Sequence, residues 1–129
     1  MLSTPWGRAD FQVQLTPGFY KVSTPSHGGF MITNKVFRQF NLNPVALKFH
    51  PYGGDYNGYH CFEEDCEADV ILLELSIMQP ELFYALSSPV DARRVYTRPL
   101  TQETIIDSLS RHTPTYLYCL NIDPTCAAL

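Results

Sequence analysis

One histidine stands between a serine and two glycines in the segment STPSHGGF, residues 23–30. The imidazole of His27 could act as a general base or as a metal ligand, because it exchanges a proton near neutral pH. Gly28 and Gly29 can adopt positive φ angles, which would let nearby backbone N–H groups point into a pocket and bind an oxyanion or phosphate. The alternative is a Gly-Gly turn in which a hydrogen-bonded histidine has a structural part only.

A dense acidic run follows in the segment FEEDCEAD, residues 62–69. Its carboxylates are typical of a helix N-terminus, where the helix dipole stabilises negative charge and no further function is needed. They could also hold a divalent cation, which prefers oxygen ligands. The pattern favours the helix start and leaves the cation site open.

The same run contains a cysteine that could be a nucleophile. Cys66 would attack a carbonyl group, His27 would be the base, and Glu63, Glu64 or Asp65 would orient the histidine or bind a metal. A position near the positive end of a helix would favour the Cys66 thiolate. Cys66 is also in phase with apolar residues of the same segment, so a buried core position is the competing interpretation.

A zinc site is the third kind of chemistry considered for this region. His60, Cys61 and Cys66 lie within seven residues, and His27 or Cys119 could complete four ligands. The spacing H-C-x4-C does not match the usual paired zinc ligands, and neighbours such as His60 and Cys61 rarely face one metal. We therefore predict neither a metal site nor a cofactor.

The N-terminal half is predicted to supply the strands that position these residues. Alternating apolar residues in 9–25 indicate two strands around the turn Thr16-Pro17-Gly18, and residues 29–33 add a third strand. Residues 33–40 are predicted to form a short helix capped by Thr33 or Asn34. The segment 41–59 shows no clear period and is predicted to be mostly loop.

The second half is predicted to be mainly helical. Helical spacing of apolar residues predicts a helix over 63–78, with a buried strand at 70–75 as the alternative. Short helices are expected at 80–87 and 101–112, the latter capped by Thr101. Residues 115–122 are predicted to be a strand and 123–129 a loose tail. The sum is a single α+β domain with an antiparallel sheet and two or three helices packed on it.

Composition narrows the class of protein. The chain has 129 residues, 45% of them hydrophobic, which is sufficient for one globular domain with a core. Its 13 acidic against 9 basic residues give a formal charge of −4, which argues against direct binding to nucleic acid. We find no secretory signal and no membrane span, so we expect a cytoplasmic protein whose four cysteines are reduced.

Several motifs occur in an order that resembles a known family. They are TPWG (4–7), PG (17–18), VSTPSHGGF (22–30) and FEEDCEADVILL (62–73). The order is similar to that of an uncharacterised domain family carried by bacteria, plasmids and phages, and it covers residues 3 to 85. The resemblance implies that the histidine-glycine and acidic motifs belong to one shared structural or functional core.

The chain also departs from the family pattern as we know it. Cys61 stands where the pattern has tryptophan, and Glu67-Ala68 where it has Asp-Trp. These changes lie beside the acidic motif, so an ancestral activity could be altered here. Residues 89–122 are predicted to be a helix-strand addition outside the resemblance.

Two function classes follow from these observations. In the first, the chain is a small acidic protein of a mobile element that binds a basic protein surface in the cytoplasm of a bacterial host, for example to inhibit a CRISPR effector complex. In the second, it is a small hydrolase with the catalytic residues His27, Cys66, Glu64 and Asp65. The candidate partner-binding residues come from the acidic run and a tyrosine-rich loop, since tyrosines are strong interface anchors. They are Glu63, Glu64, Asp65, Glu67, Tyr52, Tyr56 and Tyr59.

Overall fold

The computed structural model describes residues 1–65 and 67–121. The elements follow one another in the order β1 (Ser3–Thr4), β2 (Gly7–Arg8), β3 (Phe11–Thr16), β4 (Phe19–Ser23), β5 (Gly28–Thr33), α1 (Asn34–Gln39), the 3-10 helix η1 (Pro44–Lys48), β6 (Gly54–Tyr56), β7 (Tyr59–Glu63), α2 (Ala68–Met78), α3 (Pro80–Ala85), α4 (Gln102–His112) and α5 (Pro114–Cys119).

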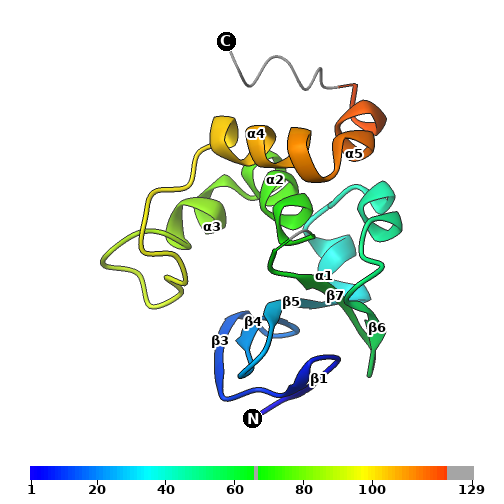
Figure 1. Cartoon of the computed structure of the whole chain (residues 1–129). Helices are drawn as coiled ribbons and strands as arrows, with labels where there is room; N and C mark the ends of the chain where they lie inside the picture. The colour runs from blue at the N-terminus through cyan, green and yellow to red at the C-terminus, as the bar shows by residue number, and fades with distance from the viewer. Residues whose placement is uncertain (66, 122–129) are drawn as a thin grey trace.

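A five-stranded antiparallel sheet is the centre of the molecule. Its strand order is β3-β4-β5-β7-β6, and the two-stranded hairpin β1–β2 forms a separate small sheet. The helices lie on one side of the large sheet and the β1–β2 hairpin lies on the other (Figure 1). The predicted class, a single α+β domain with an antiparallel sheet, is confirmed.

Each face of the sheet buries its own apolar cluster. The face toward the helices contributes Phe19, Phe30, Ile32 and Phe62 to the main core, which also contains the buried faces of α1, α2, α4 and α5. The opposite face buries a smaller cluster of Ala9, Val22, Met31 and Cys61 under the N-terminal hairpin. Because side chains alternate across a strand, neighbours in β7 belong to different clusters.

The observed β3–β4 hairpin and the N-caps of α1 and α4 agree with the predictions from the sequence. The hairpin 9–25 is β3 and β4 joined at Pro17-Gly18, where Gly18 has φ +89°. Thr33 caps α1, because its side chain accepts a hydrogen bond from the Val36 N–H. Thr101 caps α4 by accepting from the Thr104 N–H.

The segment 41–59 was predicted to be mostly loop, and more than half of it is turn or loop, but it also contains short regular elements that the sequence analysis did not predict. It contains η1 and β6, and it ends as β7 begins at Tyr59. The β6–β7 connection is Asn57-Gly58 with φ angles of +49° and +82°, which is the two-residue type I′ turn of tight hairpins. The Asn-Gly pair between two tyrosines was a readable hairpin signal.

The helix predicted over 63–78 begins later, at Ala68. Glu63 is the last residue of β7 and pairs with Gly29 of β5. Between the end of β7 and the start of α2, the Glu67 N–H donates to the Glu63 carbonyl, 2.9 Å. The strand alternative for 70–75 is wrong, since these residues lie within α2.

The strand predicted over 115–122 is also wrong, because Pro114–Cys119 is helix α5. Pro114 occupies the first helical turn, where a missing N–H costs nothing. Tyr116 and Leu117 are fully buried in the core while Tyr118 is exposed. Packing of one helical face therefore overrides the β propensity of the aromatic residues.

A buried polar link fastens α5 to the rest of the core. Glu74 of α2 accepts a hydrogen bond from the Tyr116 hydroxyl through Oε2 and one from the Asn43 N–H through Oε1, 2.7 Å. The Glu74 side chain is buried. Burial and the Glu74 carboxylate raise the pKa of Tyr116, so the phenol remains protonated.

The hydrogen bond between Tyr116 and Glu74 should contribute measurably to the stability of the fold. Tyr116→Phe should lower the free energy of unfolding by about 2 kcal/mol, because the buried Glu74 oxygen loses its donor. Urea unfolding followed by circular dichroism measures the change. Tyr118→Phe is the matched control, since the Tyr118 side chain is exposed, and an equal loss in both variants would contradict the prediction.

Within the part of the chain that the structure describes, none of the helices has the length and apolar character needed to cross a membrane.

Candidate functional site

The TPWG motif is a turn that holds a tryptophan against the large sheet. Thr4 Oγ1 accepts a hydrogen bond from the Trp6 N–H, 3.1 Å, and donates one to the Gly7 carbonyl, 2.6 Å. Gly7 has φ +115°, which L side chains rarely adopt. The turn therefore fixes Trp6, which packs against the smaller cluster.

The β4–β5 connection presents His27. Its carbonyl accepts hydrogen bonds from the Thr24 N–H and the Thr24 hydroxyl, both 2.7 Å, and its own N–H donates to Thr24 Oγ1, 3.1 Å. The backbone of His27 is thus fixed on both sides by one threonine. Its side chain remains about half exposed.

The two glycines after His27 serve close packing and not a positive-φ turn. Neither glycine adopts a positive φ angle, and both lie in β5, so the possible N–H cradle for an oxyanion is wrong and so is the alternative of a Gly-Gly turn. A Cβ on Gly28 would come within 2.5 Å of the Val22 carbonyl oxygen. A Cβ on Gly29 would come within 2.1 Å of the Phe62 carbonyl oxygen and 2.8 Å of the Trp6 ring. Glycine lets β5 approach both neighbours.

Glu63 brings a carboxylate to the same place from β7. Its side chain is only 8% exposed, and His27 Nδ1 lies 3.6 Å from its Oε1. This distance suits an ion pair with a protonated histidine but exceeds a hydrogen bond. Oε2 accepts from the Asp65 N–H, 2.9 Å. The buried Oε1 has no hydrogen-bond partner among the residues described, which is unusual for a carboxylate oxygen.

Glu67 has a structural role that differs from those of the other acidic residues in this run. It is 3% exposed, and its carboxylate accepts three backbone hydrogen bonds, from the N–H groups of Tyr52 (2.7 Å), Gly53 (2.9 Å) and Glu63 (3.1 Å). The side chain thereby ties loop 51–53 to the end of β7. Glu63 and Glu67 lie inside the protein, so among the described residues of this run Glu64 and Asp65 are the exposed ones.

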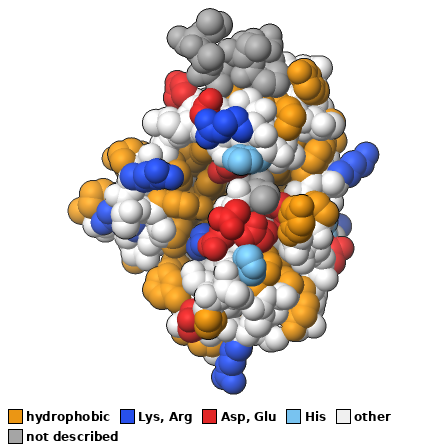
Figure 2. Space-filling model, viewed as in Figure 1, with side chains coloured by type: hydrophobic (Ala, Val, Ile, Leu, Met, Phe, Trp, Pro, Cys, Tyr) orange, Lys and Arg blue, Asp and Glu red, His pale blue; other side chains and the backbone are white. Residues whose placement is uncertain are grey.

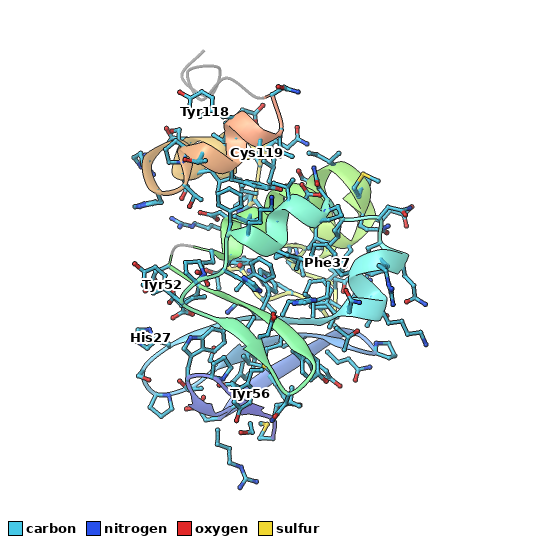
Figure 3. The ribbon with its side chains drawn as sticks, turned by 90° about the vertical axis from the view of Figure 1, so that its right-hand side faces the viewer. His27, Phe37, Tyr52, Tyr56, Tyr118 and Cys119 are labelled. Carbon is cyan, nitrogen blue, oxygen red and sulfur yellow. The ribbon has the colours of Figure 1, made fainter. Side chains whose placement is uncertain are left out.

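These elements enclose one pocket. It has a volume of about 330 Å³ and is lined by Trp6, His27, Tyr52, Glu63 and Asp65. Figure 2 shows acidic side chains gathered beside a histidine in the middle of one face of the molecule. In Figure 3, His27 and Tyr52 lie at the same edge, whereas Tyr56 lies apart from them. The volume falls in the range of small-ligand sites.

Glu64 leaves the pocket and turns toward the helices. Its Oε2 lies 3.8 Å from Lys21 Nζ, and it lines a second hollow of about 510 Å³ together with Asp65, Asp69 and residues of α4. Burial lowers the pKa of Lys21, while the nearby Glu64 and Glu63 carboxylates oppose this shift. Of the catalytic set predicted from sequence, His27 and Asp65 share the pocket and Glu64 does not line it.

The structure tests the hypotheses about Cys61 but not those about Cys66. Cys66 lies outside the described residues. Cys61 is a buried free thiol in the smaller cluster, and burial raises its pKa to about 12, so it is a poor nucleophile. His60 contacts Phe37 of the main core, so it lies on the other face of β7 from Cys61. The two residues do not face one metal.

The other two tyrosines are held by structural contacts. The Tyr56 hydroxyl shares a 2.6 Å hydrogen bond with Ser3 Oγ, and the Tyr59 ring packs edge-on against Tyr20 at 6.2 Å. Both are partly buried against the smaller cluster. Tyr52 is the tyrosine of the predicted set that lines the pocket.

Trp6 is the pocket residue to which the sequence analysis gave no role. The TPWG motif was identified only because it occurs in the same order as the other motifs of the family pattern. Trp6 is the one tryptophan of the chain, and the threonine and glycine around it are typical of a tight turn. These signals indicated a presented aromatic side chain, but the strand that it packs against was not readable.

The fold and the site define a class of protein: an α+β domain with helices on one face of an antiparallel sheet, and an aromatic and acidic pocket. Three of the sequence motifs and loop 51–53 supply the residues that line this pocket. The chain belongs to the family described as Domain of unknown function (DUF7007), whose model matches residues 1–117. The match extends beyond residues 3 to 85 and includes every residue that lines the pocket. Comparisons with curated proteins and with solved structures gave no match.

Proposed function

We propose that the protein acts by binding a partner protein, and that the pocket receives an arginine or lysine side chain of that partner. The observation that carries the proposal is Glu63, which lines the pocket and whose buried Oε1 has no hydrogen-bond partner among the described residues. A buried carboxylate oxygen with free acceptor capacity is stabilised by a cationic donor. A guanidinium or ammonium group supplies both the charge and the N–H donors.

The walls of the pocket suit the same ligand. Trp6 and Tyr52 offer aromatic faces, which attract cations, and Asp65 adds a second carboxylate. Arginine is favoured over lysine, because its planar group can stack on an aromatic ring while donating to a carboxylate. The formal charge of −4 adds long-range attraction to a basic surface.

The proposed partner is a basic, nucleic-acid-binding surface of a host defence complex, such as a CRISPR effector. Such a groove presents arginine and lysine side chains to phosphates, and a small acidic protein from a phage or plasmid would compete for them. The action is in the bacterial cytoplasm and needs no direct contact with nucleic acid.

A second candidate, a small hydrolase, is favoured by one distance. His27 Nδ1 lies 3.6 Å from Glu63 Oε1, so the carboxylate could orient the imidazole while the ring takes a proton from water. Asp65 would line the same reaction space. In this alternative His27 is indispensable, whereas in the binding proposal the charge of Glu63 is the essential feature and the half-exposed His27 is not required.

Capture from bacterial lysate by the tagged protein tests the proposal. Glu63→Gln keeps an acceptor for the Asp65 N–H but removes the charge, and should reduce capture of a basic complex at least about tenfold. Glu81→Gln removes the same charge from an exposed position on α3 and should leave capture unchanged. Added salt should weaken capture by the unaltered protein.

The same experiment separates the two candidates. His27→Ala should still capture the partner if the protein is a binder. Equal capture by Glu63→Gln and the unaltered protein would contradict the binding proposal. Loss of a hydrolytic activity in folded His27→Ala would favour the enzyme.

A further inference from the structure

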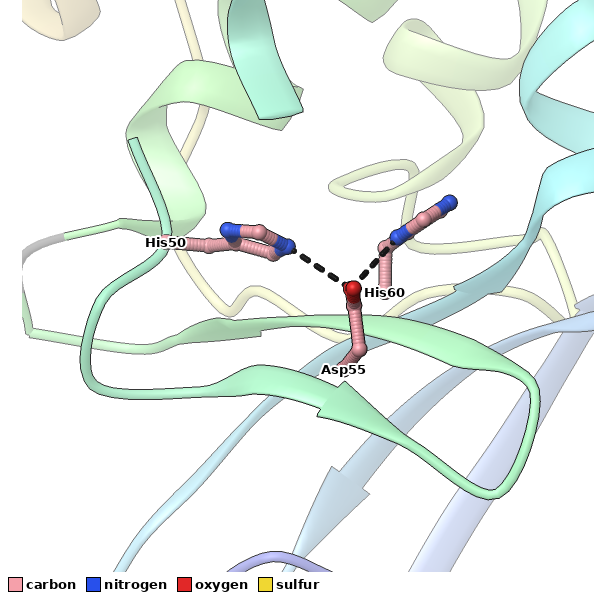
Figure 4. A group of neighbouring side chains, drawn as sticks. All are labelled: His50, Asp55 and His60. Carbon is pink, nitrogen blue, oxygen red and sulfur yellow. Dashed lines mark hydrogen bonds and ion pairs between the residues drawn. The ribbon is translucent and has the colours of Figure 1, made fainter. Parts of the chain in front are cut away.

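A second cluster of chemistry-bearing side chains lies on the helix side of the β6–β7 hairpin (Figure 4). His50 Nε2 lies 3.0 Å from Asp55 Oδ1, and His60 Nδ1 lies 2.7 Å from the same oxygen. One ligand atom from each of the three residues lies within 4.8 Å of the other two. Two imidazole nitrogens and a carboxylate oxygen thus point at one small volume.

The backbone brings these three residues together before any ligand arrives. Asp55 of β6 and His60 of β7 are direct cross-strand partners in the hairpin. The Gly54 N–H donates to the His50 carbonyl, 2.7 Å, which closes the loop that carries the third residue. A rigid arrangement of this kind lowers the entropy cost of binding.

Packing fixes the two rings and leaves the carboxylate open. The His50 ring lies 5.0 Å from the Phe62 ring between centroids, and the His60 ring lies 6.0 Å from that of Phe37. The histidine side chains are 13% and 18% exposed, whereas Asp55 is 70% exposed. A ligand held by the three groups would have protein on one side and solvent on the other.

We propose that His50, Asp55 and His60 bind one divalent transition-metal ion of the zinc type. Metal–ligand bonds of about 2.1 Å place neighbouring ligands about 3.0–3.4 Å apart, and the two nitrogen–oxygen distances of 3.0 and 2.7 Å lie close to this spacing. Two imidazoles with one carboxylate suit Zn²⁺, Fe²⁺ or Co²⁺, while Ca²⁺ and Mg²⁺ prefer oxygen alone. Three protein ligands leave at least one coordination position for water or a further ligand.

Metal binding would replace the hydrogen bonds from His50 and His60 to Asp55 with little additional cost in free energy. The buried His60 Nε2 has no hydrogen-bond partner among the residues described, so the ring proton can move there without breaking a second contact. The metal replaces the protons that now lie between the imidazoles and the carboxylate. The proposal differs from the expectation of no metal drawn from the sequence, which considered His60 but not His50 or Asp55.

A titration of the purified whole chain with Co²⁺, followed by visible absorption, tests this proposal. We expect saturable binding of one ion with bands typical of nitrogen and oxygen ligands, and displacement by Zn²⁺. Asp55→Asn should weaken binding at least about tenfold, as even changes behind a metal ligand do. Because Asp55 is largely exposed, this variant should fold normally; His60→Gln provides a second test.

His27→Ala is the control, because His27, Glu63 and Asp65 form another group of possible ligands. It should bind Co²⁺ like the unaltered protein. The proposal is overturned by an absence of saturable binding, by binding that depends on His27 and not on Asp55, or by absorption bands that indicate thiolate ligands. Failure would leave the binding proposal intact, because partner capture can be measured with a metal chelator present.

Discussion

Glu67→Ala should lower the free energy of unfolding by at least about 3 kcal/mol, one of the two largest effects expected of a single substitution in this chain. The Glu67 carboxylate accepts hydrogen bonds from three backbone N–H groups, and an alanine leaves the buried Glu63 N–H and the partly buried N–H groups of Tyr52 and Gly53 without this partner. The loss should also release Tyr52 from the pocket.

Chemical denaturation of Glu67→Ala beside Glu103→Ala measures this effect. Glu103 is exposed in the first turn of α4, so its removal should cost less than about 1 kcal/mol. Glu67→Gln should be intermediate, because an amide oxygen can satisfy some of the donors while the amide nitrogen opposes another. A Glu67→Ala protein as stable as the Glu103 control would show that the three hydrogen bonds are dispensable.

Gly29→Ala should cost about 3 kcal/mol, through a different mechanism. The added Cβ would lie 2.1 Å from the Phe62 carbonyl oxygen, so β5 and β7 would have to separate at the place where they carry His27 and Glu63. The Trp6 ring, 2.8 Å from the same Cβ, is also in the way. We expect loss of stability and loss of partner capture together.

Two comparisons isolate the steric cause. Gly58→Ala meets no atom within 4 Å but has φ +82°, so it should cost only about 1–2 kcal/mol through backbone strain. Shortening the neighbouring ring with Trp6→Phe should fail to rescue Gly29→Ala, because the closest obstacle is backbone. Full rescue, or equal costs for Gly29→Ala and Gly58→Ala, would contradict the steric explanation. Thermal unfolding of the four proteins measures these differences.

Local signals in the sequence predicted much of the secondary structure. The alternation in residues 11–23 and the Thr33 and Thr101 caps act within a few residues, so they could be read without tertiary information. Helix α5 could not be read in this way. Its aromatic residues favour a strand locally, and the helical conformation depends on burying Tyr116 beside Glu74.

The candidate site was only partly predictable for a related reason. His27 and the acidic run were identified by residue type, but their meeting depends on the pairing of Gly29 with Glu63 across β5 and β7. Strand order and register depend on tertiary contacts, so they could not be predicted from the local patterns of a single sequence. The inward turn of Glu67 was hidden for the same reason, since its partners lie 14 and 15 residues earlier in the chain.

The His50, Asp55 and His60 cluster was missed because its segment was taken for loop. Asn57-Gly58 between Tyr56 and Tyr59 predicts a two-residue hairpin turn. That hairpin places residues 55 and 60 opposite each other. The signal was therefore present in the sequence.

Fluorescence of Trp6 provides the most direct test of the binding pocket, because Trp6 is the one tryptophan in the chain and lines the pocket. The purified protein is titrated with an arginine-rich peptide and with the same peptide carrying glutamine for arginine. We predict a saturable change in emission with the arginine peptide alone, and at least about tenfold weaker binding for Glu63→Gln but not for Glu81→Gln. Unchanged emission, or equal affinity in Glu63→Gln, would contradict a pocket that receives a basic side chain.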